Sequence, residues 1–150
     1  MSVYTLKQIK EFLPHREPFL FVDEVIECDD AKRIVAVKRL TPDEYYFAGH
    51  FPGNPVMPGV IQIETIAQTA GILSIKWALS HGHKIVPFLM SIAKTKFRKV
   101  VRPGDCLRIE VWLLQQRRLN GKFAGRILVD GKVTCETELM CAMVSEENRI

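Results

Sequence analysis

The sequence predicts an α+β fold in which a mostly antiparallel sheet curls around one long helix. Residues 60–79 are apolar on nearly all sides and include several small residues, so a helix there should be buried rather than half-exposed. Residues 85–144 contain runs in which apolar and polar residues alternate, and Asn120-Gly121 and Asp130-Gly131 are typical of hairpin turns. A sheet made of such strands must curl to bury the helix on several sides.

The remaining segments supply a short helix and further strands. Thr5-Leu6-Lys7-Gln8 resembles a capping box, and apolar residues recur at helical spacing until Pro14 ends the helix. The runs 19–29 and 33–40 are rich in Val, Ile or Phe and are expected to form two strands. No linker, repeat or low-complexity segment separates the elements, so residues 1–150 are expected to form one domain. Later strands are expected at residues 86–100, 107–113 and 133–144, with the whole of 85–144 running as a meander.

Composition excludes several classes of protein. Hydrophobic residues make up 47% of the chain and charged residues 25%, as in ordinary globular proteins. The net charge of +4 favours an acidic partner but is too small to indicate nucleic acid, and no nucleic-acid motif is present. The sequence has no signal peptide and no apolar run of about 18 residues, so a cytoplasmic protein with no membrane partner is expected.

Cysteine and histidine spacing gives no sign of a metal or a cofactor. The four cysteines form no CxxC pair, and each is expected to be a buried or half-buried apolar residue in a reducing compartment. His81 and His83 are not joined by other ligands at metal-binding spacing. Neither a metal nor a cofactor is therefore expected.

The segment Gly49–Ala67 is where we expect the chemistry of this protein. It places His50 in a loop rich in proline and glycine, and it places Glu64 about one turn inside the apolar helix. Because proline fixes φ, the loop should hold His50 in a fixed geometry. Gly59, at the start of the helix, should offer an N–H group that has no partner within the helix.

His50 and Glu64 are suited to the β-elimination of water. Imidazole titrates near neutral pH, and burial of Glu64 would favour its protonated form. The base would remove a proton next to a carbonyl, and the acid would protonate the departing hydroxyl. The Gly59 N–H would stabilise the enolate. On spacing alone, a structural or solvated histidine and a solvent-facing glutamate fit the same pattern.

The motifs resemble those of the (3R)-hydroxyacyl-acyl-carrier-protein dehydratases of type II fatty-acid synthesis. The resemblance rests on Gly49-His50-Phe51-Pro52-Gly53 and Pro55-Val56-Met57-Pro58-Gly59, followed by Glu64 and Ala67-Gln68. It extends over nearly the whole chain, through Leu13-Pro14-His15-Arg16 and Pro103-Gly104-Asp105. It implies a hot-dog fold, a trans-2-enoyl product and no cofactor.

The resemblance also implies roles for individual residues. His50 matches the catalytic histidine, and Glu64 matches the catalytic acid that the partner subunit of a homodimer supplies. The Val56 carbonyl matches the group that orients the imidazole, and the Gly59 amide matches the donor to the thioester carbonyl. Gln68, one helical turn after Glu64, is expected to bind within the site because of its i, i+4 spacing. Besides the homodimer, we consider a hexamer formed as a trimer of dimers.

Two positions refine this assignment. The related branch that also isomerises its product has Asp at the acid position, so Glu64 favours the dehydratase that does not isomerise. Asn54 departs from the pattern, because the family often has a second histidine there. We expect this change to leave the chemistry intact.

A basic strand is the expected docking surface. Lys94, Lys96 and Arg98 alternate along one face, which would suit an acidic acyl carrier protein and the phosphate of its phosphopantetheine arm. An ordinary solvated strand face fits equally well. Phe97 should point away from Lys96 and Arg98, into either an acyl tunnel or the core. His15 is assigned, with Arg16, to the N-terminal strand or the dimer.

Two other functions are weighed against the dehydratase. A hot-dog thioesterase would use the same helix end, with a carboxylate that positions water, and would release free thiol. A non-catalytic protein would bind the acyl carrier tightly without elimination.

Overall fold

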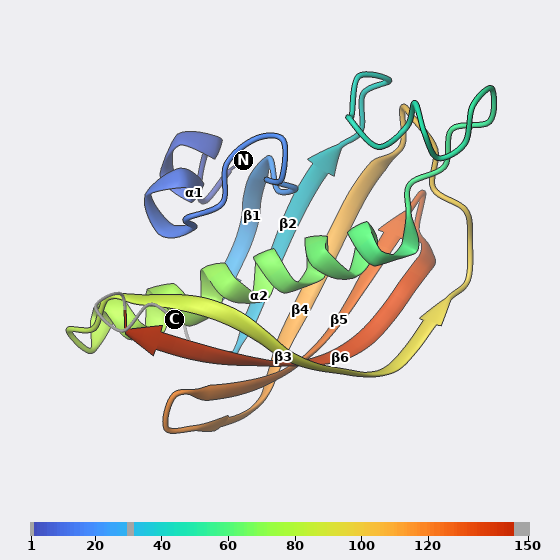
Figure 1. Cartoon of the computed structure of the whole chain (residues 1–150). Coiled ribbons are helices and arrows are strands. Elements are labelled where there is room, and N and C mark those ends of the chain that lie inside the picture. The colour runs from blue at the N-terminus through green and yellow to red at the C-terminus, as the bar shows by residue number, and fades with distance from the viewer. Residues whose placement is uncertain (1, 30–31, 146–150) are drawn as a thin grey trace.

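The computed structural model describes residues 2–29 and 32–145, in which a six-stranded antiparallel sheet wraps around a long helix (Figure 1). This is the α+β hot-dog architecture that the sequence predicts. The strand order is β1-β2-β4-β5-β6-β3. The elements are α1 (Leu6–Phe12), β1 (Glu24–Asp29), β2 (Arg33–Arg39), α2 (Gly59–Ser80), β3 (Ile85–Phe97), β4 (Cys106–Arg117), β5 (Asn120–Val129) and β6 (Lys132–Ser145).

The expected meander over 85–144 is wrong, because β3 does not pair with β4. Strand β3 pairs with β6 and forms one edge of the sheet, so only β4, β5 and β6 are neighbours in chain order. The connection after β3 passes the start of α2, where the Met57 N–H donates to the Val101 carbonyl over 2.8 Å. It rejoins the sheet beside β2, where the Leu40 N–H donates to the Asp105 carbonyl over 3.0 Å. Alternation identifies strands but does not identify their neighbours.

The strand expected over 19–29 is shorter, because a helix side chain takes the place of a neighbouring strand. Gln68 of α2 accepts a hydrogen bond from the Phe21 N–H (2.8 Å) and donates one to the Phe19 carbonyl (2.9 Å). The strand therefore begins only at Glu24. By contrast, the expected bounds of α2 are correct to within one residue at each end.

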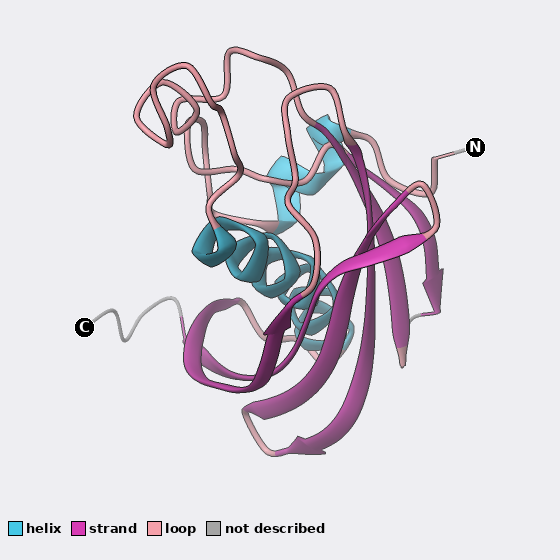
Figure 2. Cartoon of the chain, turned by 90° about the vertical axis from the view of Figure 1, so that its right-hand side faces the viewer, coloured by secondary structure: helices cyan, strands magenta, loops and turns pink. Residues whose placement is uncertain are grey.

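Helix α2 packs very closely against the middle of the sheet. A Cβ atom added to Gly125 of β5 would lie 2.3 Å from Cγ2 of Ile66, which is fully buried. Only a glycine fits the present spacing between β5 and α2. Figure 2 shows the strands curving around the helix. No helix among the described residues is long and apolar enough to cross a membrane.

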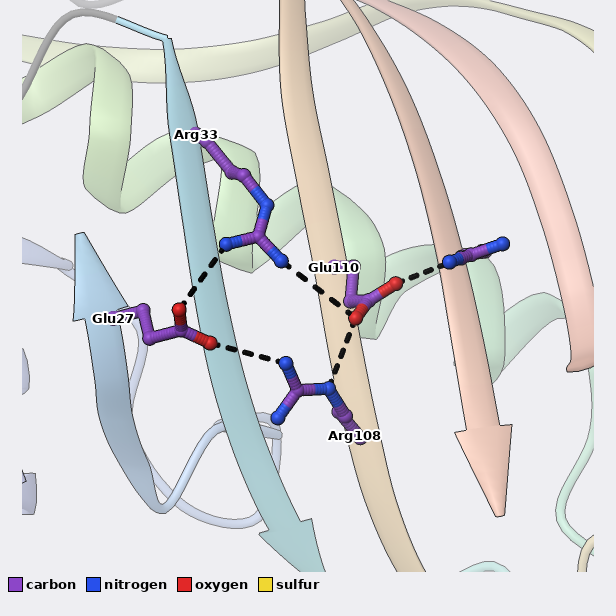
Figure 3. Close-up of polar contacts among 5 residues, drawn as sticks. Glu27, Arg33, Arg108 and Glu110 are labelled. Carbon is purple, nitrogen blue, oxygen red and sulfur yellow. Dashed lines mark hydrogen bonds and ion pairs between the residues drawn. The ribbon is translucent and has the colours of Figure 1, made fainter. Parts of the chain in front are cut away.

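The outer face of the sheet carries charged side chains in place of an apolar layer (Figure 3). Glu110 of β4, whose side chain is 8% exposed, accepts hydrogen bonds from Arg108 (2.9 Å) and Arg126 (2.7 Å). Arg33 lies 3.8 Å away, and Glu27 joins Arg33 to Arg108. Among the cysteines, Cys106 is exposed, contrary to expectation, whereas Cys28, Cys135 and Cys141 are buried or half-buried.

Candidate active site

The loop before α2 fixes both the position and the tautomer of His50. The loop is closed by paired backbone hydrogen bonds between Phe51 and Asn54 (2.9 and 2.8 Å), and the Val56 N–H donates to the His50 carbonyl (2.7 Å). His50 Nδ1 lies 2.7 Å from the Val56 carbonyl oxygen. A carbonyl only accepts, so Nδ1 must carry the hydrogen. In the neutral imidazole, Nε2 is then left with a lone pair that can accept a proton.

His50 lines a cavity of about 530 Å³ at the start of α2. Gly59 and Phe97 line the same cavity, as do Val56 and Arg98. A Cβ atom at Gly59 would lie 2.7 Å from the Phe97 ring, so the ring packs directly on the glycine. Gly59 is the first residue of α2, where amide groups have no partner within the helix. The cavity therefore combines a proton acceptor with a candidate oxyanion donor.

Glu64 lies farther along α2, where its side chain is 22% exposed. Burial raises the pKa of Glu64, and a hydrogen bond from Gln68 (Nε2 to Oε2, 3.0 Å) partly opposes this. The orientation of the Gln68 amide is fixed, because its oxygen accepts from the Phe21 N–H and its nitrogen must therefore donate. The i, i+4 contact expected between Gln68 and Glu64 is thus present.

The predicted base and acid do not line the same cavity of one chain. Glu64 and Gln68 line a second cavity of about 430 Å³, together with His15, Phe19, residues of β3 and Cys141. His50 does not contribute to it. Burial raises the pKa of Cys141 to about 11, so its thiol stays protonated near neutral pH and is a poor nucleophile.

The basic residues of β3 that were expected to share one face lie beside carboxylates on the outer face of the sheet. A bulge interrupts the strand between Ala93 and Lys96, and Lys94 has a φ of 51°. Lys94 lies 3.4 Å from Glu138, and Arg98 donates to Glu136 over 2.7 Å. Lys94 and Lys96 line the same hollow on this face, together with Glu136 and Glu138.

Phe97 and Arg98 both line the His50 cavity, but the Phe97 ring packs on Gly59 whereas the Arg98 guanidinium reaches Glu136 on the outer face, as strand alternation predicts.

Sequence reasoning missed two contacts close to the site. His15, assigned to the N-terminal strand or the dimer, places its Nε2 3.6 Å from Glu64 Oε2. Asn54, where the sequence departs from the family pattern, accepts a hydrogen bond from Arg102 over 2.9 Å and so ties the His50 loop to the turn before β4. The motif around His15 was visible in the sequence, but its proximity to Glu64 was not. No group of three or more His, Cys, Asp or Glu residues in the described part of the chain could hold a metal ion.

Comparison with known proteins shows the family of this chain. Residues 13–138 match the model of the FabA-like domain. The chain belongs to the FabA-like family. It is 45% identical over 141 residues to a 3-hydroxyacyl-[acyl-carrier-protein] dehydratase FabZ of Coxiella burnetii, which covers 93% of this chain and 97% of that protein. The FabZ of Solibacter usitatus is 42% identical over 149 residues, which is 99% of this chain and 91% of that protein.

Solved structures show the same fold in several enzymes. The dehydratase heterocomplex ApeI:P from Xenorhabdus doucetiae has a TM-score of 0.80 and 21% identity, and covers 93% of this chain and 92% of that one. Thioesterase PA1618 from Pseudomonas aeruginosa has a TM-score of 0.70 and 14% identity, and covers 96% of each chain. At these identities the likeness concerns the fold alone. The FabA-like match and the FabZ relatives, not the fold, distinguish the dehydratase from the thioesterase.

Proposed function

We propose that this protein dehydrates (3R)-3-hydroxyacyl thioesters on acyl carrier protein to the trans-2-enoyl thioesters, in the cytoplasm and without isomerising the product. The observation that carries the proposal is the His50 tautomer, because the Val56 carbonyl leaves Nε2 free to accept a proton beside the start of α2. The FabZ relatives support the substrate class. The whole chain acts as one domain in this proposal.

The elimination uses the two candidate groups on opposite sides of the substrate. His50 Nε2 takes the proton from C2, and the electron pair of that C–H bond forms the C2=C3 double bond. The C3–O bond breaks, and Glu64 gives its proton to the hydroxyl, which leaves as water. The Gly59 amide donates to the thioester oxygen while negative charge develops on it. The raised pKa of Glu64 suits this role, because the group must start protonated.

The site is completed by a second copy of the chain. Within one chain, His50 and Glu64 line different cavities, so neither cavity holds both groups. Strand β3 is a sheet edge with exposed apolar side chains, and such an edge is suited to pairing with another chain. The exposed apolar residues are Phe88, Leu89, Met90 and Ile92. Pairing there would place His50 of one protomer with Glu64 of the other, in a homodimer or in a trimer of dimers.

The carrier protein is proposed to dock near the mouth of the His50 cavity. Arg98 lines that cavity, and Lys96 lies two residues before it on β3. The positive charges of both side chains would attract an acidic partner. Because Arg98 is already paired with Glu136, docking would exchange one carboxylate partner for another.

Mixing two inactive variants tests the shared site. His50→Ala and Glu64→Gln proteins are unfolded together and refolded, and activity is measured on a hydroxyacyl carrier-protein substrate. A mixed dimer has one site with both defects and one with neither, so random pairing should restore roughly a quarter of normal activity. Refolding each variant alone is the control. An inactive mixture that is shown to contain mixed dimers would contradict the shared site, and release of free thiol would favour the thioesterase.

A further inference from the structure

The segment between α1 and β1 holds His15 rigidly against α2. Arg16 donates to the carbonyls of Leu13 (2.8 Å), His15 (2.6 Å) and Lys10 (2.9 Å). The guanidinium therefore satisfies carbonyl groups at the end of α1 that have no partner in the helix. Gln68 fixes the chain a few residues later through Phe19. The backbone of His15 is thus held on both sides.

The His15 side chain faces Glu64 and has no other described partner. Its Nε2 lies 3.6 Å from Glu64 Oε2, and its Nδ1 is buried without a hydrogen-bond partner among the described residues. Burial, and then the charge of Arg16, lower the pKa of His15, so the ring is neutral near neutral pH. A neutral imidazole has one N–H group, and Glu64 offers it an acceptor.

We propose that His15 is a positioning residue for Glu64, to which it donates its Nε2–H as the carboxyl group becomes a carboxylate. This role rests on the proposed function, in which Glu64 loses its proton to the departing hydroxyl. At 3.6 Å the contact is longer than a hydrogen bond, so it is weak while Glu64 is protonated. It tightens when charge appears on the carboxylate, because hydrogen bonds to charged groups are shorter and stronger.

The other groups around Glu64 cannot replace this donor. Gln68 already binds Glu64 Oε2, and its amide is fixed at both ends. The S–H group of Cys141 on β6 is only a weak donor, and Arg16 is turned toward carbonyl groups. Strand β3 contributes apolar residues, from Val86 to Leu89. His15 is therefore the group near Glu64 that can respond to a change in its charge.

Two substitutions of His15 separate positioning from packing. His15→Leu removes the N–H, whereas His15→Gln keeps an N–H donor at a similar reach. We expect His15→Leu to lower kcat about tenfold, the scale of a lost hydrogen bond to a charged group, with KM changed less than about twofold. His15→Gln should restore most of kcat. His83→Leu, at an exposed histidine after α2, is the matched control and should behave as wild type.

The pH dependence gives a readout that packing alone would not change. Without the donor the Glu64 carboxylate is less stable, so the basic limb of kcat should move to higher pH in His15→Leu. Carbon-13 NMR titration of the Glu64 carboxyl group should show the same upward shift of its pKa, independently of activity. Equal losses in His15→Leu and His15→Gln, with an unshifted Glu64 titration, would overturn the positioning role. An inactive wild-type protein would instead refute the proposed function, and this role with it.

Discussion

The Val56 carbonyl and the burial of Glu64 act on single residues in complementary ways. The carbonyl selects the His50 tautomer whose Nε2 is a base, and burial favours the form of Glu64 that is an acid. Each effect requires only one or two neighbouring groups. The elimination proposed here therefore depends on atoms whose removal can be tested one at a time.

We expect His50→Ala and Glu64→Gln each to lower kcat by about a hundredfold or more, the usual scale for a lost general base or acid. The free energy of unfolding should change little, because His50 lies in a loop and Gln can occupy the half-buried site of Glu64. Steady-state kinetics and urea unfolding of each variant provide the measurements. A folded variant that keeps most of its activity would remove that residue from the mechanism.

The pH profile of kcat should be bell-shaped. Activity should fall at alkaline pH as Glu64 loses its proton, and it should fall at acid pH because a general base must start unprotonated. Because burial raises the pKa of Glu64, its limb should lie above the range of an ordinary glutamate. Glu64→Gln should abolish the alkaline limb while the residual activity keeps the acid limb. A flat profile would contradict acid–base chemistry at this pair.

At the residue scale, contacts between residues close in sequence could be predicted, whereas contacts between residues distant in sequence could not. His50, Glu64 and the Gln68–Glu64 contact followed from one continuous segment, in which helical spacing and a rigid loop determine the geometry. His15 could not be recognised, because it is 49 residues from Glu64 in sequence and is brought close only by tertiary packing. Its motif was visible, but no local rule connects it to the carboxyl group.

Strand β3 shows where element-scale reasoning succeeds and fails. Its residues were correctly expected to form a strand, but its partner is β6, and a bulge interrupts it between Ala93 and Lys96. Strand partners depend on long connections, here the one that passes the start of α2. A bulge adds one residue to one strand of a pair and locally disrupts the pairing. Neither feature leaves a clear local pattern.

Charge reversal tests the role of this strand in docking. Lys96→Glu combined with Arg98→Glu should raise KM for carrier-protein substrates and leave the kinetics with short pantetheine analogues nearly unchanged. Removal of the Arg98–Glu136 pair should have little effect on stability, since solvent screens ion pairs between exposed side chains. Reversal of Lys122, which is paired with Glu138 on the outer face, is the matched control. Equal losses on both substrate types would indicate damage to the His50 cavity instead of lost docking.

The molecule as a whole has two very different surfaces. The edge at β3 exposes apolar side chains, whereas the outer face of the sheet carries Glu110 and its arginines (Figure 3). A charged face that satisfies its own hydrogen bonds gains little from association with an apolar partner. The sequence showed the alternating pattern that produces this face, but it could not show which arginines meet Glu110.

Glu110→Gln should destabilise the protein near neutral pH by about 1–2 kcal/mol, since it weakens charged hydrogen bonds to partly exposed arginines. Burial alone would raise the pKa of Glu110, but the hydrogen bonds from Arg108 and Arg126 outweigh it and lower that pKa. The stabilisation is therefore present above the pKa of an unfolded glutamate and is lost as pH falls through the lowered value. The difference between wild type and variant in urea unfolding should shrink toward acid pH. Glu27→Gln, at a side chain that is 51% exposed, should have a smaller effect.

The close approach of Gly125 to Ile66 has a consequence for how the sequence tolerates change. Gly125 lines neither of the two cavities at α2, yet one added methyl group there would displace the helix that carries Glu64 and Gln68. In a library of random variants selected only for activity, alanine at this position should be as rare as replacements of the catalytic pair. A survey of tolerated substitutions, read without the structure, would count Gly125 among the catalytic residues, although it touches no substrate in the proposed reaction.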